Sequence, residues 1–166
     1  RCNLSCVYCY NREERTYFVK EHREMSTEQM KWALDQMADF GIPQFNFCGG
    51  EPTIYPELDR LVSELLDRKR HIYLCTHGMF IRRRLHEFRP SSRFFFNVHL
   101  DGLEATHDMC VERPGVFREA IEGIKAAKDA GFLVCSNTTI YKQTDLSEIT
   151  ELYGYLQNLG VDGFMI

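Results

Sequence analysis

The sequence lacks several features that define broad classes of protein. It has no run approaching the ~18 consecutive apolar residues that a membrane-spanning helix needs, so we expect no transmembrane segment. It has no excess of positive charge, because 20 Lys and Arg residues stand against 24 Asp and Glu residues, and this gives no electrostatic case for a nucleic-acid partner. It has neither a signal-like start nor an even number of cysteines. Its seven cysteines therefore favour reduced thiols in a cytoplasmic protein over a disulfide framework.

The length and the two ends of the chain bear on its domain organisation. A chain of 166 residues can form one domain with a substantial core. It begins at Arg1 without a methionine and stops at Ile166, inside an apolar run that is typical of a strand. We therefore expect a single domain, residues 1–166, that is an excised part of a longer protein.

Short apolar runs alternate with segments of helical periodicity along most of the chain. The runs predict strands over residues 44–48, 71–76, 94–100, 132–137 and 163–166. Helices are predicted over residues 26–40, 56–66, 80–88, 116–130 and 145–159, with Ser26 and Asp145 as N-caps of the first and the last. Such alternation predicts an α/β fold of right-handed βα units on a parallel sheet. Periodicity does not choose between a doubly wound sheet and a barrel, but both place the loops after the strands at one edge.

Three cysteines within the first nine residues carry the clearest chemical signal. Cys2, Cys6 and Cys9 have the spacing C-x3-C-x2-C, one ligand short of a closed zinc site or a fully cysteine-ligated 4Fe-4S cluster. Cys6 and Cys9 alone also fit a thioredoxin-like dithiol or half of a zinc site, and the three together fit an electron-transfer or iron-sensing module. A thioredoxin-type pair opens a helix after a strand, whereas residues 11–25 are charged and without period, which is typical of a loop.

This spacing, with the aromatic Tyr8 just before the third cysteine, resembles the cluster loop of the radical S-adenosylmethionine (SAM) superfamily. The resemblance implies that the three cysteines bind three irons of a 4Fe-4S cluster and that SAM binds the fourth. Reduction then cleaves SAM to a 5′-deoxyadenosyl radical. It also implies a flavodoxin or ferredoxin as reductant, and a small-molecule, lipid or peptide substrate. The implied fold is a partial, six-unit (β/α) barrel, of which the first strand and the end of the sixth are missing here.

Other motifs at predicted strand ends extend the resemblance. Residues 49–52 match the superfamily's G-G-E-P segment, which hydrogen-bonds the amino group of SAM. Thr76-His77-Gly78 departs from the usual T-N-G, and His99-Leu100-Asp101-Gly102 departs from S-x-D-G, whose polar groups face the carboxylate and ribose of SAM. The remaining cofactor contacts are implied at Tyr8, along the adenine, and at Asn137. The implied cofactor-binding set is Tyr8, Gly49, Gly50, Glu51, Pro52, Thr76, His99, Asp101 and Asn137.

Each of these residues also has a structural interpretation. A G-G-E-P tetrapeptide alone is usually an ordinary turn. A histidine such as His99 on a strand is as often a neutral, hydrogen-bonded core residue. The stretch with His107-Asp108 and, further on, Arg113 resembles the H-D-x-x-R of these relatives, and its structural interpretation is that it positions the following helix. Of the remaining thiols, Cys48, Cys75 and Cys135 are interpreted as solitary, buried strand residues, and a second cluster on any of them, or on Cys110, is the less favoured alternative.

Within the superfamily, four stretches are similar to the radical SAM enzymes of hopanoid biosynthesis. They are residues 73–76, 98–102, 137–139 and 160–163. That likeness implies addition of the adenosyl radical to an alkene of a hopene lipid. The cluster loop and the charged loop after it differ from those enzymes. Peptide- and cofactor-maturing enzymes that act by hydrogen abstraction are therefore the competing prediction.

Overall fold

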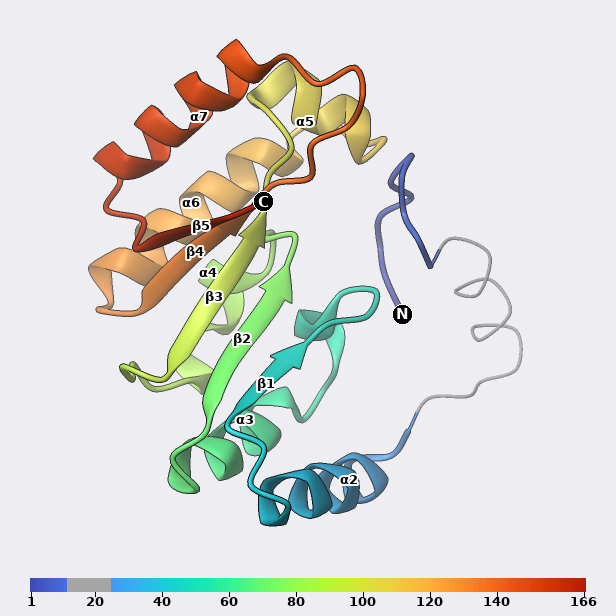
Figure 1. Ribbon diagram of the computed structural model, residues 1–166, viewed down its shortest axis with the longest axis vertical. Helices are drawn as coiled ribbons and strands as arrows, with labels where there is room; N and C mark the ends of the chain where they lie inside the picture. The colour runs from blue at the N-terminus through green and yellow to red at the C-terminus, as the bar shows by residue number, and fades with distance from the viewer. Residues whose placement is uncertain (12–24) are drawn as a thin grey trace.

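The computed structural model describes residues 1–11 and 25–166, and a five-stranded parallel sheet is its centre (Figure 1). The strands lie side by side in sequence order: β1 (Gln44–Phe47), β2 (His71–Thr76), β3 (Phe94–His99), β4 (Leu133–Asn137) and β5 (Gly163–Met165). Each crossover therefore moves one strand in the same direction. This is the winding of a (β/α) barrel, because a doubly wound sheet reverses its strand order. The predicted sixth unit stays a prediction.

Helices connect the strands and pack against one face of the sheet, with the N-terminal residues on the opposite side (Figure 1). The α-helices are α2 (Thr27–Asp39), α3 (Leu58–Asp67), α4 (Ile81–Arg84), α5 (Glu104–Cys110), α6 (Val116–Asp129) and α7 (Leu146–Asn158), and single 3-10 turns are η1 (Pro52–Ile54) and η2 (Leu85–Glu87). Both predicted N-caps are confirmed: Ser26 forms a capping box with Gln29, and Asp145 accepts from the Ser147 amide. The loop predicted over residues 11–25 lies almost entirely outside the described residues.

Some elements differ from the prediction. The second helix begins at Leu58 and not at Pro56, and its N-cap residue, Glu57, makes no side-chain capping hydrogen bond. The helix predicted over 80–88 is split into α4 and η2. Two elements, α5 and η1, were not predicted. Leu103 gives α5 no side-chain cap, and η1 is held by the side chain of Glu51.

The two faces of the sheet differ in chemistry. Ile72 and Leu74 of β2, Phe94 and Phe96 of β3 and Val134 of β4 are fully buried in the core. Alternate strand residues point the other way, and that face carries thiol, amide and imidazole groups around a cavity. The outer face of the sheet therefore forms the core, and the inner face forms the wall of the cavity.

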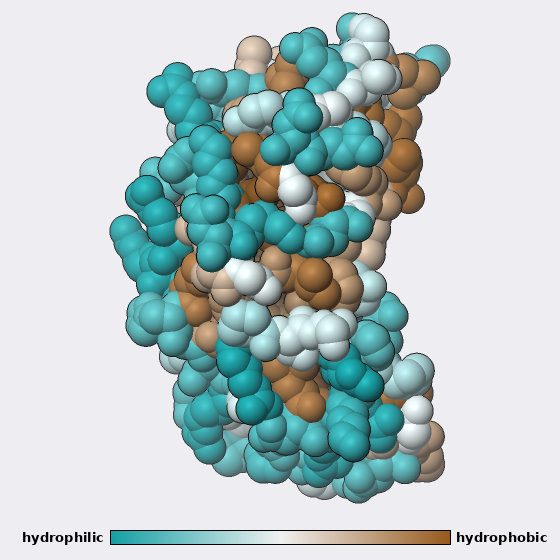
Figure 2. Space-filling model, turned by 90° about the vertical axis from the view of Figure 1, so that its left-hand side faces the viewer, coloured by the Kyte–Doolittle hydropathy of each residue, from teal (hydrophilic) through white to brown (hydrophobic). Residues whose placement is uncertain are grey.

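The outer, helical side of the molecule is dominated by hydrophilic side chains, with separate apolar patches between them (Figure 2). None of the helices among residues 1–11 and 25–166 is long and apolar enough to cross a membrane.

Candidate active site

Backbone hydrogen bonds and an apolar cluster hold the cysteine-bearing segment, residues 1–10, against the barrel. The Arg1 carbonyl accepts a hydrogen bond from the Glu51 amide at 2.7 Å, and the Val7 amide donates to the Cys110 carbonyl at 2.9 Å. Between them, Leu4 is buried in a small apolar cluster with two residues near the start of α6. These anchors place the segment beside the carboxyl ends of the strands.

The predicted cluster cysteines share a cavity with most of the predicted SAM-binding residues. The cavity has a volume of ≈ 280 Å³. Its walls include Cys2, Cys6 and Cys9 together with Tyr8, Gly49, Gly50, Glu51, Thr76, His99, Asp101 and Asn137. Pro52 is the exception, because it lines a neighbouring pocket beside α3. Positions up to 135 residues apart in the sequence thus meet at the edge of the sheet where both barrel and doubly wound folds place their chemistry.

The arrangement of the three thiols bears on which metal group they fit. Within residues 1–11 and 25–166, no three His, Cys, Asp or Glu side chains converge on a single metal ion. A 4Fe-4S cluster does not require such convergence, because each cysteine sulfur binds a different iron. The three thiols are only partly exposed.

Positions 49 and 50 require glycine for two different structural reasons. Gly49 has φ +131°, a backbone conformation that side chains rarely adopt. A Cβ on Gly50 would lie 1.9 Å from the Arg1 carbonyl oxygen and 2.8 Å from the Cβ of Cys2. Only glycine at this position lets the cysteine-bearing segment approach the turn so closely.

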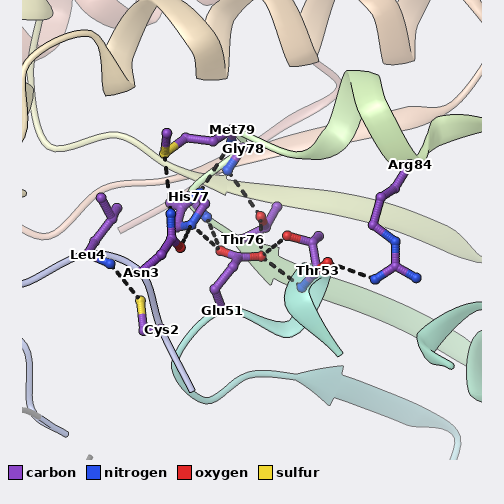
Figure 3. A network of polar contacts seen from close by, with 10 residues as sticks. All are labelled: Cys2, Asn3, Leu4, Glu51, Thr53, Thr76, His77, Gly78, Met79 and Arg84. Carbon is purple, nitrogen blue, oxygen red and sulfur yellow. Dashed lines mark hydrogen bonds and ion pairs between the residues drawn. The ribbon is translucent and has the colours of Figure 1, made fainter. Parts of the chain in front are cut away.

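Glu51 is the centre of a buried hydrogen-bond network (Figure 3). Its Oε1 accepts from the amide and hydroxyl of Thr53 and from the Thr76 hydroxyl at 2.7 Å. Its Oε2 accepts from the His77 amide at 2.9 Å. The carboxylate is therefore occupied by internal donors, and 3% of the residue is exposed. The Thr76 hydroxyl is occupied too, because it also accepts from the Gly78 amide.

His77 joins this network to the cysteine-bearing segment (Figure 3). Its Nδ1 accepts from the Met79 amide at 3.2 Å, so the ring proton lies on Nε2. Nε2 is 2.8 Å from the Asn3 side-chain oxygen, to which it donates, and 3.3 Å from Oε2 of Glu51. Burial lowers the pKa of His77, which favours the neutral ring. The departure from T-N-G thus gives the loop a direct contact with the end of β2.

The polar groups at the ends of β3 and β4 keep more capacity for a ligand. Asp101 accepts from the Thr139 amide at 2.9 Å, and its other oxygen is 2.9 Å from Nε2 of His99. The His99 side chain is 30% exposed, so the core interpretation of this residue is wrong. Two residues before His99 on the same strand, the side-chain oxygen Oδ1 of Asn97 is buried without a hydrogen-bond partner. The sequence interpretation missed Asn97, although an amide within the run Phe94–His99 is an unusual interruption.

His107 and Asp108 have structural roles. Asp108 accepts from the amides of Gly115 and Phe117, which confirms that it positions α6. His107 is fully buried, and its Nδ1 accepts from the Asp101 amide at 3.2 Å. At the cavity mouth, the Tyr8 ring stacks on Tyr141 with centroids 4.0 Å apart. The sequence interpretation did not single out Tyr141.

Solved structures contain the same arrangement of strands and helices. The chain matches Streptococcus suis SuiB bound to S-adenosylmethionine with a TM-score of 0.81 and 19% identity, covering 98% of this chain and 35% of SuiB. It matches anSMEcpe with bound AdoMet and a peptide with a TM-score of 0.70 and 17% identity, covering 99% of this chain and 47% of that one. These similarities define the fold as that of a partial (β/α) barrel.

The sequence profile of the Radical SAM superfamily matches residues 1–156, and the chain belongs to this family. It is 31% identical, over 95% of its length, to the Fe-coproporphyrin III synthase of Methanosarcina barkeri, and 30% identical, over 99%, to the AdoMet-dependent heme synthase of the same organism. It is 26% identical, over 98%, to the GTP 3′,8-cyclase of Listeria welshimeri. It spans 39%, 47% and 49% of these relatives, about half their length or less.

Membership in the superfamily identifies the cofactors as a 4Fe-4S cluster and SAM. The residues present fit both. Three thiols line one cavity, Gly50, which has no space for a Cβ, brings the turn against Cys2, and a buried amide oxygen at Asn97 has no protein partner.

Proposed function

We propose that this chain is the core of a radical SAM enzyme that matures a cofactor or a peptide by hydrogen abstraction. The observation that carries the proposal is the single cavity shared by Cys2, Cys6, Cys9 and the polar ends of the strands. It supports catalysis over a simple electron-transfer module, because such a module has no use for a ligand cavity beside its cluster.

The chain's own residues would hold and orient the cofactors. Cys2, Cys6 and Cys9 would bind three irons and leave the fourth to SAM, and the bound pair supplies a 5′-deoxyadenosyl radical on reduction. Gly49 and Gly50 line the cavity, and their backbone would approach the bound ligand without a side chain in the way.

The remaining contacts come from the other side of the cavity. We assign Asp101 and Asn137 to the ribose and carboxylate side of SAM, with His99 supported by Asp101. Tyr8, stacked on Tyr141, lies where the adenine would meet an aromatic surface. Glu51 and Thr76 act indirectly in this proposal, because their side chains are engaged with protein groups.

The names of the curated relatives favour maturation chemistry over addition to a lipid. Two of them are named for iron coproporphyrin and heme and one for GTP. SuiB and anSMEcpe have been solved with peptides, but below 25% identity they support the fold alone. The hopanoid likeness stays a competing prediction. A flavodoxin or ferredoxin is the reductant that we propose.

The first test measures cleavage of SAM. The protein, reconstituted anaerobically with iron and sulfide, should release 5′-deoxyadenosine from SAM only when a low-potential reductant is present. Cys6→Ala should abolish the cluster absorption and the cleavage, whereas Cys135→Ala, which removes a buried thiol outside the cavity, should retain both. Cleavage by Cys6→Ala at the wild-type rate would contradict the proposal.

The second test separates hydrogen abstraction from addition. Deuterated iron coproporphyrin, GTP and a hopene lipid are offered in turn to the reconstituted protein. Abstraction from a substrate transfers deuterium into 5′-deoxyadenosine. Addition to the lipid instead yields a covalent adenosyl adduct, and that product would replace our proposal with the hopanoid prediction.

A further inference from the structure

Two thiols outside the cysteine-bearing segment are neighbours in the cavity wall. Phe47 of β1 pairs in register with Leu74 of β2, so the next residues along the two strands, Cys48 and Cys75, stand side by side. Parallel neighbours in register point to the same face, and both residues line the cavity. The interpretation of these two cysteines as solitary, buried residues is therefore wrong. It holds for Cys135, which is buried.

The placement of this pair meets the geometric requirement for a disulfide. Adjacent strands lie about 4.8 Å apart, within the 4.4–6.8 Å range of Cα separations that disulfides span. Both side chains line the cavity, so a bond between them would lie in its wall.

The two thiols are chemically unequal. Cys48 is exposed, and the hydrogen bond from Cys75 lowers the pKa of its thiol to about 7. Cys75 is partly buried, and the same hydrogen bond together with burial raises the pKa of its thiol. Its sulfur also accepts from the Asn97 amide nitrogen at 3.6 Å. An exposed thiolate beside a protonated thiol is the arrangement of an attacking and a resolving cysteine.

We propose that Cys48 and Cys75 are a redox-active dithiol site in the wall of the SAM cavity, and that its substrates are small disulfides of the glutathione type. The Cys48 thiolate attacks one sulfur of the small disulfide, the bond between its two sulfurs breaks, and one small thiolate leaves. Cys75 then loses its proton, attacks the Cys48 sulfur and displaces the second small thiol. Two protein thiols are oxidised to one disulfide, and one small disulfide is reduced to two thiols.

Oxidation would act on the cavity through the turn that follows Cys48. A bond from Cys48 to β2 would tie the turn at Gly50, which packs against Arg1 and Cys2, to the neighbouring strand. Bound SAM would cover the same wall and protect the pair. This consequence for SAM rests on the proposed function, whereas formation of the disulfide does not.

The test uses the full, cluster-reconstituted protein under argon with glutathione disulfide as the probe. Samples are quenched in acid, alkylated and mapped by mass spectrometry. Wild-type protein should lose two alkylatable thiols and yield a cross-linked Cys48–Cys75 peptide that dithiothreitol reverses. Cys75→Ser should stop at a glutathione adduct on Cys48, Cys48→Ser should form no bridge, and Cys135→Ala should behave as wild type.

Several results would overturn the dithiol site. They are a stable glutathione adduct on wild-type Cys48 without a bridge, a bridge between other cysteines, or modification of Cys48 no faster than that of Cys110. From the difference in thiolate content we expect at least about a tenfold faster reaction at Cys48 than at Cys110, whose thiol pKa is raised by burial. SAM at saturation should slow formation of the bridge. If the bridge forms at the same rate with and without SAM, the dithiol stands and the assignment of SAM to this cavity fails.

Discussion

The two ends of the cavity use a buried carboxylate in opposite ways. At the β1–β2 end, Glu51 accepts from Thr53, Thr76 and His77, and all of these donors belong to the scaffold. At the β3–β4 end, Asp101 holds one backbone amide and one imidazole, that of His99, which reaches the cavity. An acidic residue after a strand therefore does not define a ligand contact by itself. Its remaining hydrogen-bonding capacity does.

The largest effect that this comparison predicts is a loss of stability in Glu51→Gln. The amide would turn an NH2 group toward buried donors of Thr76 or His77 and leave at least one of them unpaired. We expect the unfolding free energy of the apoprotein to fall by about 3 kcal/mol, measured by urea denaturation. Glu57→Gln is the matched control, because Glu57 bonds Thr27 and Arg60 with a side chain that is 42% exposed, and it should cost less than about 1 kcal/mol.

A different outcome would break the comparison. If Glu51→Gln unfolds at the same urea concentration as wild type but loses SAM affinity in calorimetry, Glu51 is a direct ligand. The two ends of the cavity would then be equivalent.

The difference between the two carboxylates was not accessible from the sequence. The motif predicted that Glu51 lies beside the cavity, and it does. It did not predict which way the carboxylate points, because its partners Thr76 and His77 are 25 and 26 residues away in the sequence. The sequence interpretation likewise missed the contact between Cys48 and Cys75, since strand register is a tertiary property that short apolar runs do not specify.

The fold was more accessible, because its signals are local. All five strands were predicted to within one residue at each end, from apolar runs that end near glycine or polar residues. Helix α5 was not predicted, because its sequence has neither a capping residue nor an apolar face. His107 is its one buried residue. The choice of a barrel required the strand order, which no periodicity contains.

The second prediction concerns the β3–β4 end and acid. Burial lowers the pKa of His107 to about 4, whereas an unfolded histidine titrates near 6.5. Above pH 6.5 both states are neutral, and this contribution to stability is complete. Below pH 6.5, His107 binds a proton in the unfolded chain but stays neutral in the native state. The unfolding free energy therefore falls by about 1.4 kcal/mol per pH unit, and the total loss is about 3 kcal/mol at pH 4.

Urea denaturation at several pH values between 7 and 4 measures this slope. His107→Gln retains an acceptor for the Asp101 amide and should flatten the slope, although it should also lower stability at pH 7. His86→Gln, at an exposed position, should leave the slope unchanged. Equal slopes in wild type and His107→Gln would mean that His107 does not support the Asp101 turn as a neutral ring.

The smallest effect is expected at the contact that joins the β1–β2 end to the cysteine-bearing segment. His77→Asn, which restores the asparagine of T-N-G, keeps the backbone amide that donates to Glu51 but is too short to reach Asn3 as the imidazole does. We expect a loss of about 1 kcal/mol in unfolding free energy, the usual worth of one partly buried hydrogen bond. His71→Asn, at the exposed start of β2, should change stability by less than about 0.5 kcal/mol.

A double-mutant cycle with Asn3→Ala isolates this contact from other effects of either change. If Nε2 of His77 donates to Asn3, the losses of unfolding free energy in the two single variants, added together, should exceed the loss in the double variant by about 1 kcal/mol. Simple additivity would show that the hydrogen bond between His77 and Asn3 does not help to hold the cysteine-bearing segment, which then depends on its other contacts, such as those at Arg1, Leu4, Val7 and Tyr8. The scaffold carboxylate of Glu51 would then have no side-chain link to the cluster site, and its influence on SAM would pass through the turn at Gly50 alone.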